Sequence, residues 1–167
     1  GDIPVRYISF FAIIIVVLTG CSAEYENMME QTTNASQLYD MGDIVYVNEL
    51  SFVVRDVEVQ EHEEKEQKHV IVTIEARNNG KQPAPVANEY FVLFDSEDRM
   101  FESDPFESLA VNEDEYFSLA DPINPGLKRQ AKIVFIVPMD AADFTLAIRD
   151  NIFDFGGAHY QFVYLGN

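Results

Sequence analysis

The chain has 167 residues, and 29 Asp and Glu against 11 Lys and Arg give it a formal net charge of −18 at pH 7. A charge of this sign repels phosphate backbones, so the composition excludes nucleic acid as an expected partner. Hydrophobic residues make up 47% of the chain, which is enough for one domain with a sizeable core. Because Cys21 is the only cysteine, that core has to be stable without a disulfide inside the chain.

Residues 1–20 are typical of a secretory signal peptide. The apolar run of about twelve residues after Arg6 would rise about 18 Å as a helix, which is short of a hydrocarbon core of about 30 Å. The sequence Leu18-Thr19-Gly20-Cys21 resembles the lipobox of bacterial lipoproteins. This resemblance implies cleavage between Gly20 and Cys21 and a lipid on the Cys21 thiol, hence a domain held at the extracytoplasmic face of the cell membrane. The alternative is a buried core segment with an incidental cysteine.

Residues 21–37 predict the lipidated cysteine and a flexible acidic tether. The stretch after Cys21 has no sustained apolar periodicity and is rich in Glu, Asn, Thr and Ser. Sixteen residues of random coil span about 20 to 25 Å, which is enough to lift a small domain off a bilayer. A short helix through Tyr25, Met28 and Met29 is the alternative.

From Leu38 onward, short runs of β-branched and aromatic residues alternate with turn-forming residues, and this pattern predicts strands. The predicted strands cover residues 44–47, 50–59, 69–76, 89–94, 130–137, 144–148 and 159–165. The predicted turns lie at 78–80, 95–98, 124–126 and 156–157. No convincing helix is longer than two turns, so residues 38–167 predict an all-β, antiparallel sandwich of about seven to nine strands. With 13 Phe and 8 Tyr, its core should be aromatic.

Several of these pieces together resemble a family of exported bacterial lipoproteins with the domain of unknown function 4352. The resemblance rests on the Asn79-Gly80 turn, the Phe91, Leu93 and Asp95 pattern, the Pro125-Gly126 turn, and the segment 134–138. It covers about residues 39–165 and implies an immunoglobulin-like, telokin-like sandwich. Two features depart from the family pattern, namely Glu97-Asp98 where Gly is common and an acidic insert before His69. The family has no agreed chemistry, so no catalytic residue carries over.

Two acidic segments are candidate metal sites. The stretch 60–69, "QEHEEKEQKH", places His62 and His69 among carboxylates, a combination that suits zinc or related ions. Its other interpretation is a solvated hairpin loop whose charges keep strand edges apart. A second cluster, which includes Asp95, Glu97 and Asp98, has carboxylates that suit calcium but lacks the EF-hand spacing. We expect solvated loops in both places, and neither a metal nor another cofactor.

An enzyme is not expected, because no nucleophile elbow, zinc-protease motif or phosphate-binding loop occurs. Only His62, His69 and His159 offer near-neutral general bases. A hydrolase would need His159 or His69 to meet a carboxylate and a nucleophile in one cleft.

The region between the strands predicted at 89–94 and 130–137 reads as loops at one end of the sandwich, where recognition surfaces are common. Its aromatic residues are candidate partner contacts or, alternatively, core residues: Phe101, Phe106, Tyr116 and Phe117. The sequence therefore favours a non-enzymatic envelope lipoprotein that binds another protein. The alternatives are a ligand or divalent-metal (calcium or zinc) sensor that uses the acidic loops, and addition of a partner strand to an edge that the sequence does not identify.

Overall fold

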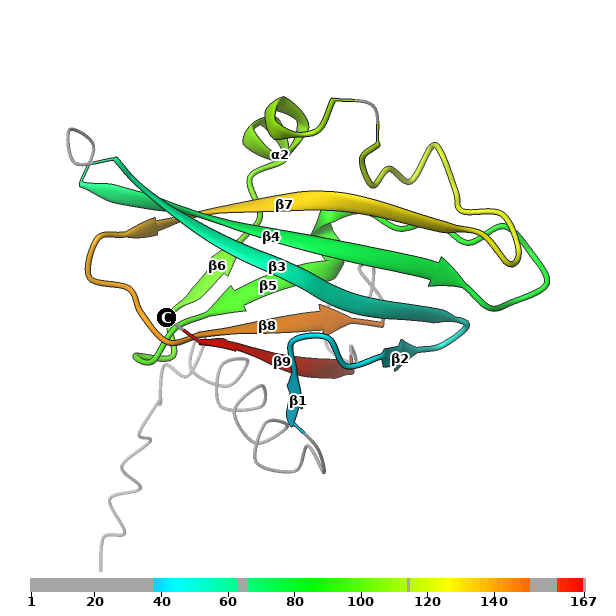
Figure 1. The fold of residues 1–167 in the computed structure, drawn as a ribbon, viewed down its shortest axis with the longest axis horizontal. Helices are drawn as coiled ribbons and strands as arrows, with labels where there is room; N and C mark the ends of the chain where they lie inside the picture. The colour runs from blue at the N-terminus through cyan, green and yellow to red at the C-terminus, as the bar shows by residue number, and fades with distance from the viewer. Residues whose placement is uncertain (1–37, 63–65, 114, 151–158, 167) are drawn as a thin grey trace, which may run out of the picture.

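The structure, a computed structural model, describes residues 38–62, 66–113, 115–150 and 159–166. Within these residues, nine strands form two facing sheets (Figure 1). The prediction of an all-β, immunoglobulin-like sandwich of about seven to nine strands is therefore confirmed. The predicted signal peptide and tether, with Gly20 and Cys21, lie outside the described residues. In the part of the chain that is described, no helix is long and apolar enough to cross a membrane.

The first sheet has the strand order β1-β9-β8-β5-β6. The strands are β1 (Leu38–Asp40), β9 (Tyr160–Gly166), β8 (Phe144–Arg149), β5 (Phe91–Phe94) and β6 (Met100–Glu102). All neighbours are antiparallel except β1 and β9, which run parallel with Leu38 opposite Phe162. The predicted antiparallel arrangement thus has one exception, between the first and the last described strands.

The second sheet has the order β2-β3-β4-β7 and is antiparallel throughout. Its strands are β2 (Val45–Val47), β3 (Leu50–His62), β4 (Gln67–Asn78) and β7 (Lys128–Pro138). Alternation along β4 sets one face toward the first sheet, since Val70, Val72, Ile74 and Ala76 are all fully buried. This face was predicted by the period of two in the sequence.

The core between the sheets is aromatic, as the composition predicts. Phe52, Phe91, Phe135 and Phe144 are fully buried. Phe52 from the second sheet meets Phe91 from the first edge to face, with ring centroids 5.6 Å apart. This contact joins the two layers at a favourable aromatic geometry.

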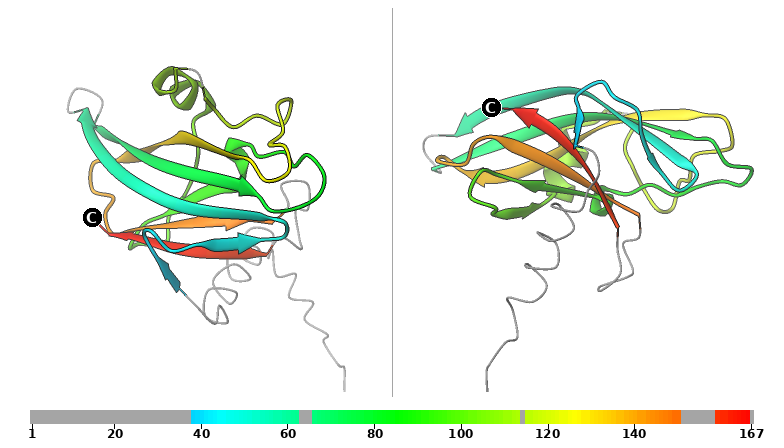
Figure 2. Two further views of the ribbon diagram at one scale, coloured as in Figure 1. Left: turned by 45° about the vertical axis from the view of Figure 1, so that its right-hand side comes forward. Right: turned by 90° about the horizontal axis from the view of Figure 1, so that it is seen from below.

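The β3–β4 hairpin is longer than the sequence predicts. Gln60 pairs with His69 and His62 pairs with Gln67, so the predicted loop at 60–69 is strand on both sides of residues 63–65. Strand β7, on the other side of β4, continues equally far, with Pro138 opposite Gln67. Polar residues adopt the extended conformation here because backbone pairing along three strands continues beyond the apolar pattern. The hairpin reaches the end of the sandwich opposite β2 (Figures 1 and 2).

The main correction to the sequence prediction concerns the region that was predicted to form loops at one end of the sandwich. After the short 3₁₀ turn η2 (Asn88–Tyr90) and the β5–β6 hairpin, the chain forms helix α2 (Pro105–Val111) beside β7 (Figures 1 and 2). Asp104 begins this helix, because its carboxylate accepts hydrogen bonds from the Phe106 and Glu107 amides at 3.0 and 2.9 Å. Pro105 fits the first helical position because its missing N–H has no partner there. The segment thus covers a sheet edge and not only an end of the sandwich.

Asn78 organises the turns at the far end of β4. It is fully buried; its amide donates to the Gln82 and Ile123 carbonyls at 2.7 and 2.8 Å, and its side-chain oxygen accepts from the Gly80 amide at 2.8 Å. At Gly80, an added Cβ would meet the side chain of Glu49, which is exposed and would have to shift. The predicted Asn-Gly turn is therefore present, and its glycine lets the Glu49 side chain pack closely against the turn.

Candidate binding surface and the predicted site residues

Helix α2 replaces a neighbouring strand along the outer edge of β7. The Ser108 hydroxyl accepts a hydrogen bond from the Val134 amide at 2.9 Å and donates one to the Asp104 carbonyl at 2.6 Å. The Asn112 side chain accepts from the Lys132 amide at 2.9 Å and donates to the Lys132 carbonyl at 2.8 Å. Its amide thereby makes both bonds that a paired strand residue would make. At Lys132 and Val134 the edge is closed by these side chains and by the Asp104 amide, which donates to the Val134 carbonyl at 2.8 Å, so this part of β7 is protected from pairing with other chains.

The same helix turns its apolar residues outward. Ser108 is 1% exposed and faces β7, whereas Phe106 is 83% exposed and Leu109 is 53% exposed. Positions three apart are neighbours on a helix surface, so Phe106 and Leu109 lie side by side. We refer to these two residues as the α2 surface. A helix with a polar residue inside and large apolar residues outside reverses the usual arrangement and leaves two large apolar side chains exposed to solvent.

The other predicted partner residues divide between core and surface. Phe117 is 5% exposed and packs on Phe91 with ring centroids 5.8 Å apart, and Phe101 is half-buried against the core. The core interpretation is therefore correct for these two. Tyr116 is exposed on the loop after α2.

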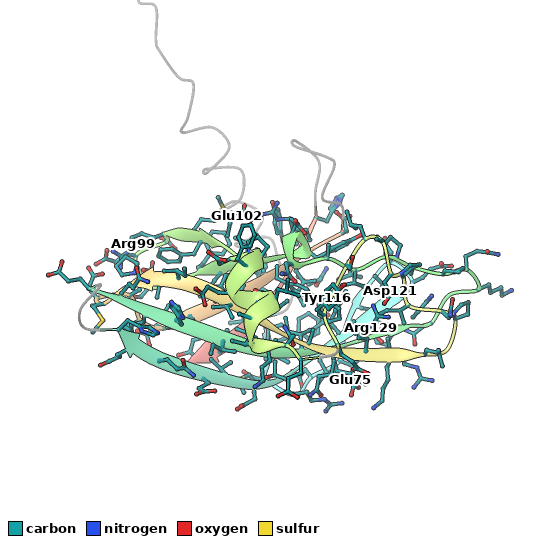
Figure 3. The ribbon with its side chains drawn as sticks, turned by 90° about the horizontal axis from the view of Figure 1, so that it is seen from above. Glu75, Arg99, Glu102, Tyr116, Asp121 and Arg129 are labelled. Carbon is teal, nitrogen blue, oxygen red and sulfur yellow. The ribbon has the colours of Figure 1, made fainter. Side chains whose placement is uncertain are left out.

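That loop is held against β7 by Arg129. The Arg129 guanidinium donates to the Asp121 carbonyl at 2.7 Å and forms an ion pair with the Asp121 carboxylate at 2.8 Å. Tyr116, Asp121 and Arg129 lie close together beside α2 (Figure 3). The loop therefore presents Tyr116 from a fixed backbone.

Asp95, a predicted calcium candidate, is used by its own turn. One carboxylate oxygen accepts from the Glu97 and Arg99 amides at 3.0 and 2.9 Å, and the other accepts from Arg99 Nε at 2.7 Å. Arg99 also meets Asp140, and these hydrogen bonds, with Asp95 as the larger cause, raise the pKa of Arg99. Glu97 and Asp98 are exposed at the tip. The prediction of a hairpin turn is confirmed, and Asp98 in this turn has a left-handed backbone conformation with φ 59°, which is uncommon for a residue other than glycine.

His62 and His69 lie on paired strands and not on a loop. Their ring centroids are 4.2 Å apart, and His69 is 7% exposed. Within the described ranges, no three His, Cys, Asp or Glu side chains gather as a ligand set.

His159 lies at the other end of the molecule. It is exposed, and its Nδ1 is 3.2 Å from the Asp150 carboxylate. Asn48, just before β3, donates to the Asp150 carbonyl at 3.3 Å, whereas His62 is the last residue of β3. A strand of this length spans roughly 40 Å, so His159 and His69 do not share a cleft.

The sequence interpretation missed Leu109, Ser108 and Asn112. One signal was present, because Asp104-Pro105 with Glu107 is a typical helix start. Nothing in the sequence indicates which side of so short a helix faces solvent.

These features define a single sandwich domain with an apolar helix on its outer surface. The chain belongs to the family described as domain of unknown function (DUF4352), whose profile matches residues 39–158. No curated protein matches the sequence significantly.

Three crystal structures are similar in fold. The chain matches yjhA from Bacillus subtilis with a TM-score of 0.57 and 14% identity, covering 77% of this chain and 99% of that one. It matches ycdA from Bacillus subtilis, described as a candidate lipoprotein, with a TM-score of 0.54 and 18% identity, covering 74% of this chain but only 38% of that one. It also matches MPT63, a secreted protein from Mycobacterium tuberculosis, with a TM-score of 0.52 and 11% identity, covering 79% of this chain and 99% of that one.

Proposed function

We propose that the protein is a cell-envelope lipoprotein, anchored through a lipid on Cys21 at the extracytoplasmic face of the membrane. Its sandwich domain binds another protein without catalysing a reaction. The observation that carries the binding role is the α2 surface, where Phe106 and Leu109 face solvent while Ser108 is buried against β7.

The location is supported by the motif Leu18-Thr19-Gly20-Cys21 and by the kinds of protein that share the fold. One similar structure is described as a candidate lipoprotein and another as a secreted protein. The negative charge of the chain fits a domain held off anionic lipid headgroups by a tether.

The chemistry of α2 defines the partner. Burying an exposed Phe or Leu side chain contributes about 1.5 to 3 kcal/mol, so the partner should offer an apolar pocket. Asp104 caps the start of α2 and Glu107 lies in its first turn, in a chain of net charge −18. A basic rim around the pocket would therefore increase the rate of association and the specificity.

The competing role, divalent-metal sensing by the acidic loops, has weaker support. The Asp95 carboxylate is buried and already accepts three hydrogen bonds. Glu97 and Asp98 alone offer few ligands on an exposed turn.

The test is capture from intact, crosslinked cells with three versions of the full chain. We expect the parent to recover a specific envelope protein, and Phe106→Ser/Leu109→Ser to lose most of it. Leu127→Ser is the matched control, because Leu127 is also exposed, at 58%, but lies outside α2. Equal recovery by all three versions, or turnover of a small substrate with no protein recovered, would contradict the proposal.

A further inference from the structure

Two histidine side chains are packed together at the end of the β3–β4 hairpin. His69 pairs with Gln60 and His62 pairs with Gln67, so the two imidazoles are diagonal neighbours on one face of the sheet. Side chains alternate along β4, and the fully buried Val70 faces the core. The histidines therefore occupy the outer face, with ring centroids 4.2 Å apart and ring planes inclined by 46°.

Both imidazoles have a buried nitrogen without a partner. The Nε2 atoms of His62 and His69 are shielded from solvent, and neither forms a hydrogen bond within the described segments. His69 as a whole is 7% exposed. A buried polar atom without a partner costs free energy, so two in contact need a specific explanation, such as a bound ion.

The neighbouring polar groups do not supply the missing partners. Glu58, on the same face of β3, accepts a hydrogen bond from the Gln60 side chain at 2.8 Å. The Lys68 ammonium donates to the Ala141 carbonyl at 2.9 Å. Among the described residues, the two Nε2 atoms therefore have no hydrogen-bond partner, and in the tautomer with the proton on Nδ1 each offers a lone pair to a ligand.

We propose that His62 and His69 together bind a borderline transition-metal dication, with water completing the coordination. Imidazole nitrogen suits Cu²⁺, Ni²⁺ and Zn²⁺ and not the hard cations Ca²⁺ and Mg²⁺, and Cu²⁺ binds most tightly in this series. Paired strands hold both ligands, since β4 lies between β3 and β7 as far as Gln67. The site shares no residue with the α2 surface or with the Asp95 turn, so it stands independently of the proposed function.

Titration calorimetry with CuCl₂ and ZnCl₂ tests the site on the full chain in detergent. Every version carries Cys21→Ser, which removes the only thiol. The variants are His62→Ala, His69→Ala and His159→Ala. The last is the matched control, because it removes the third and exposed histidine of the chain.

We expect the parent and His159→Ala to bind Cu²⁺ equally and more tightly than Zn²⁺. Each of His62→Ala and His69→Ala should weaken binding by at least about tenfold, since losing even an outer partner of a metal ligand costs 10- to 100-fold. In Cu²⁺ electron paramagnetic resonance, the parent should show coupling to two imidazole nitrogens and either single variant to one.

Three outcomes would overturn the proposal: no Cu²⁺ binding by the parent, unchanged affinity in His62→Ala, or a loss in His159→Ala as large as in the other two. Thermal unfolding without metal checks that each variant is folded. If His69→Ala unfolds, His62→Ala decides alone, because His62 is only half-buried at the strand end.

Discussion

Single buried polar residues fix the turns of this sandwich. Asn78 and Asp95 are each buried with several hydrogen bonds, whereas neighbouring polar side chains are exposed. In both cases the side chain substitutes for backbone partners that a turn cannot supply. The sequence marked both positions as turns, but their burial depends on chain segments far away, such as Ile123 for Asn78.

Asn78→Ala should destabilise the fold by about 2 to 4 kcal/mol, because it removes three hydrogen bonds made by a buried side chain: the Gln82 carbonyl and the Gly80 amide lose their bond to Asn78, and the Ile123 carbonyl keeps only the Ala84 amide. Chemical denaturation measures the difference. Asn79→Ala is the control, since Asn79 is exposed and makes one side-chain hydrogen bond, to Ser51, and it should cost less than about 1 kcal/mol. A loss for Asn78→Ala no larger than this control would contradict the account.

Glu75 should make stability depend on pH. Hydrogen bonds from Lys128 first and Arg55 second lower the pKa of Glu75 below its ordinary value of 4.5. Stability from these pairs is therefore present above about pH 4.5 and is lost as the pH falls through the lowered value. At pH 7, Glu75→Gln should cost less than about 1 kcal/mol, because both cations are largely exposed.

Denaturation midpoints of the parent and Glu75→Gln at pH 7 and at pH 3 or below check this dependence. The difference between the two midpoints should disappear at pH 3 or below. Glu115→Gln, at an exposed position, should match the parent throughout. A gap that stays constant with pH would show that the ion pairs are not its source.

At the scale of the element, the sequence predicted all four strands of the second sheet and the three inner strands of the first, but not the two edge strands of the first sheet, β1 and β6. In the run 69–76, every second residue is apolar because one face of β4 packs against the core. This requirement produces a period of two in the sequence. The strands β1 and β6 have three residues each and leave too short a pattern to detect. Helix α2 has a local start signal at Asp104-Pro105, but the hydrogen bonds that hold it against β7, from Ser108 and Asn112, are tertiary and have no local signature.

Asn112→Ala should release the end of α2 from β7. The Lys132 amide loses its acceptor, so its hydrogen exchange, measured by nuclear magnetic resonance, should accelerate while the Val70 amide in the central strand stays protected. Ala110→Ser, a change at an exposed position on the same helix, should leave the exchange of Lys132 unchanged. Unaltered protection in Asn112→Ala would contradict the proposed edge closure.

At the scale of the whole molecule, the proposed protein combines a lipid anchor, a tether and an acidic domain. The proposed anchor rests on a local sequence motif, so it could be predicted from the sequence. The proposed partner surface depends on the exposure of Phe106 and Leu109, which only the folded structure gives. Residues Phe101 and Phe117 illustrate the difference: they looked equivalent to Phe106 in sequence, yet Phe117 is buried against Phe91 and Phe101 is half-buried against the core.

Cys21→Ser should move the protein from the membrane fraction to the soluble extracytoplasmic fraction or arrest it as an unprocessed precursor. Without the thiol there is no site for the lipid. The rest of the chain, with its net charge of −18, is repelled by anionic headgroups and would not hold the protein at the membrane. Fractionation with mass spectrometry of the amino terminus measures this. A wild-type amino terminus that is intact and unlipidated in its native host would contradict the anchor.

The most direct test of the central claim is site-specific photo-crosslinking in intact cells. A photoreactive residue in place of Phe106 should yield one discrete adduct with an envelope protein, and the same residue in place of Leu127 should not. Adducts that are absent at Phe106, or identical from both positions, would contradict a binding role for the α2 surface.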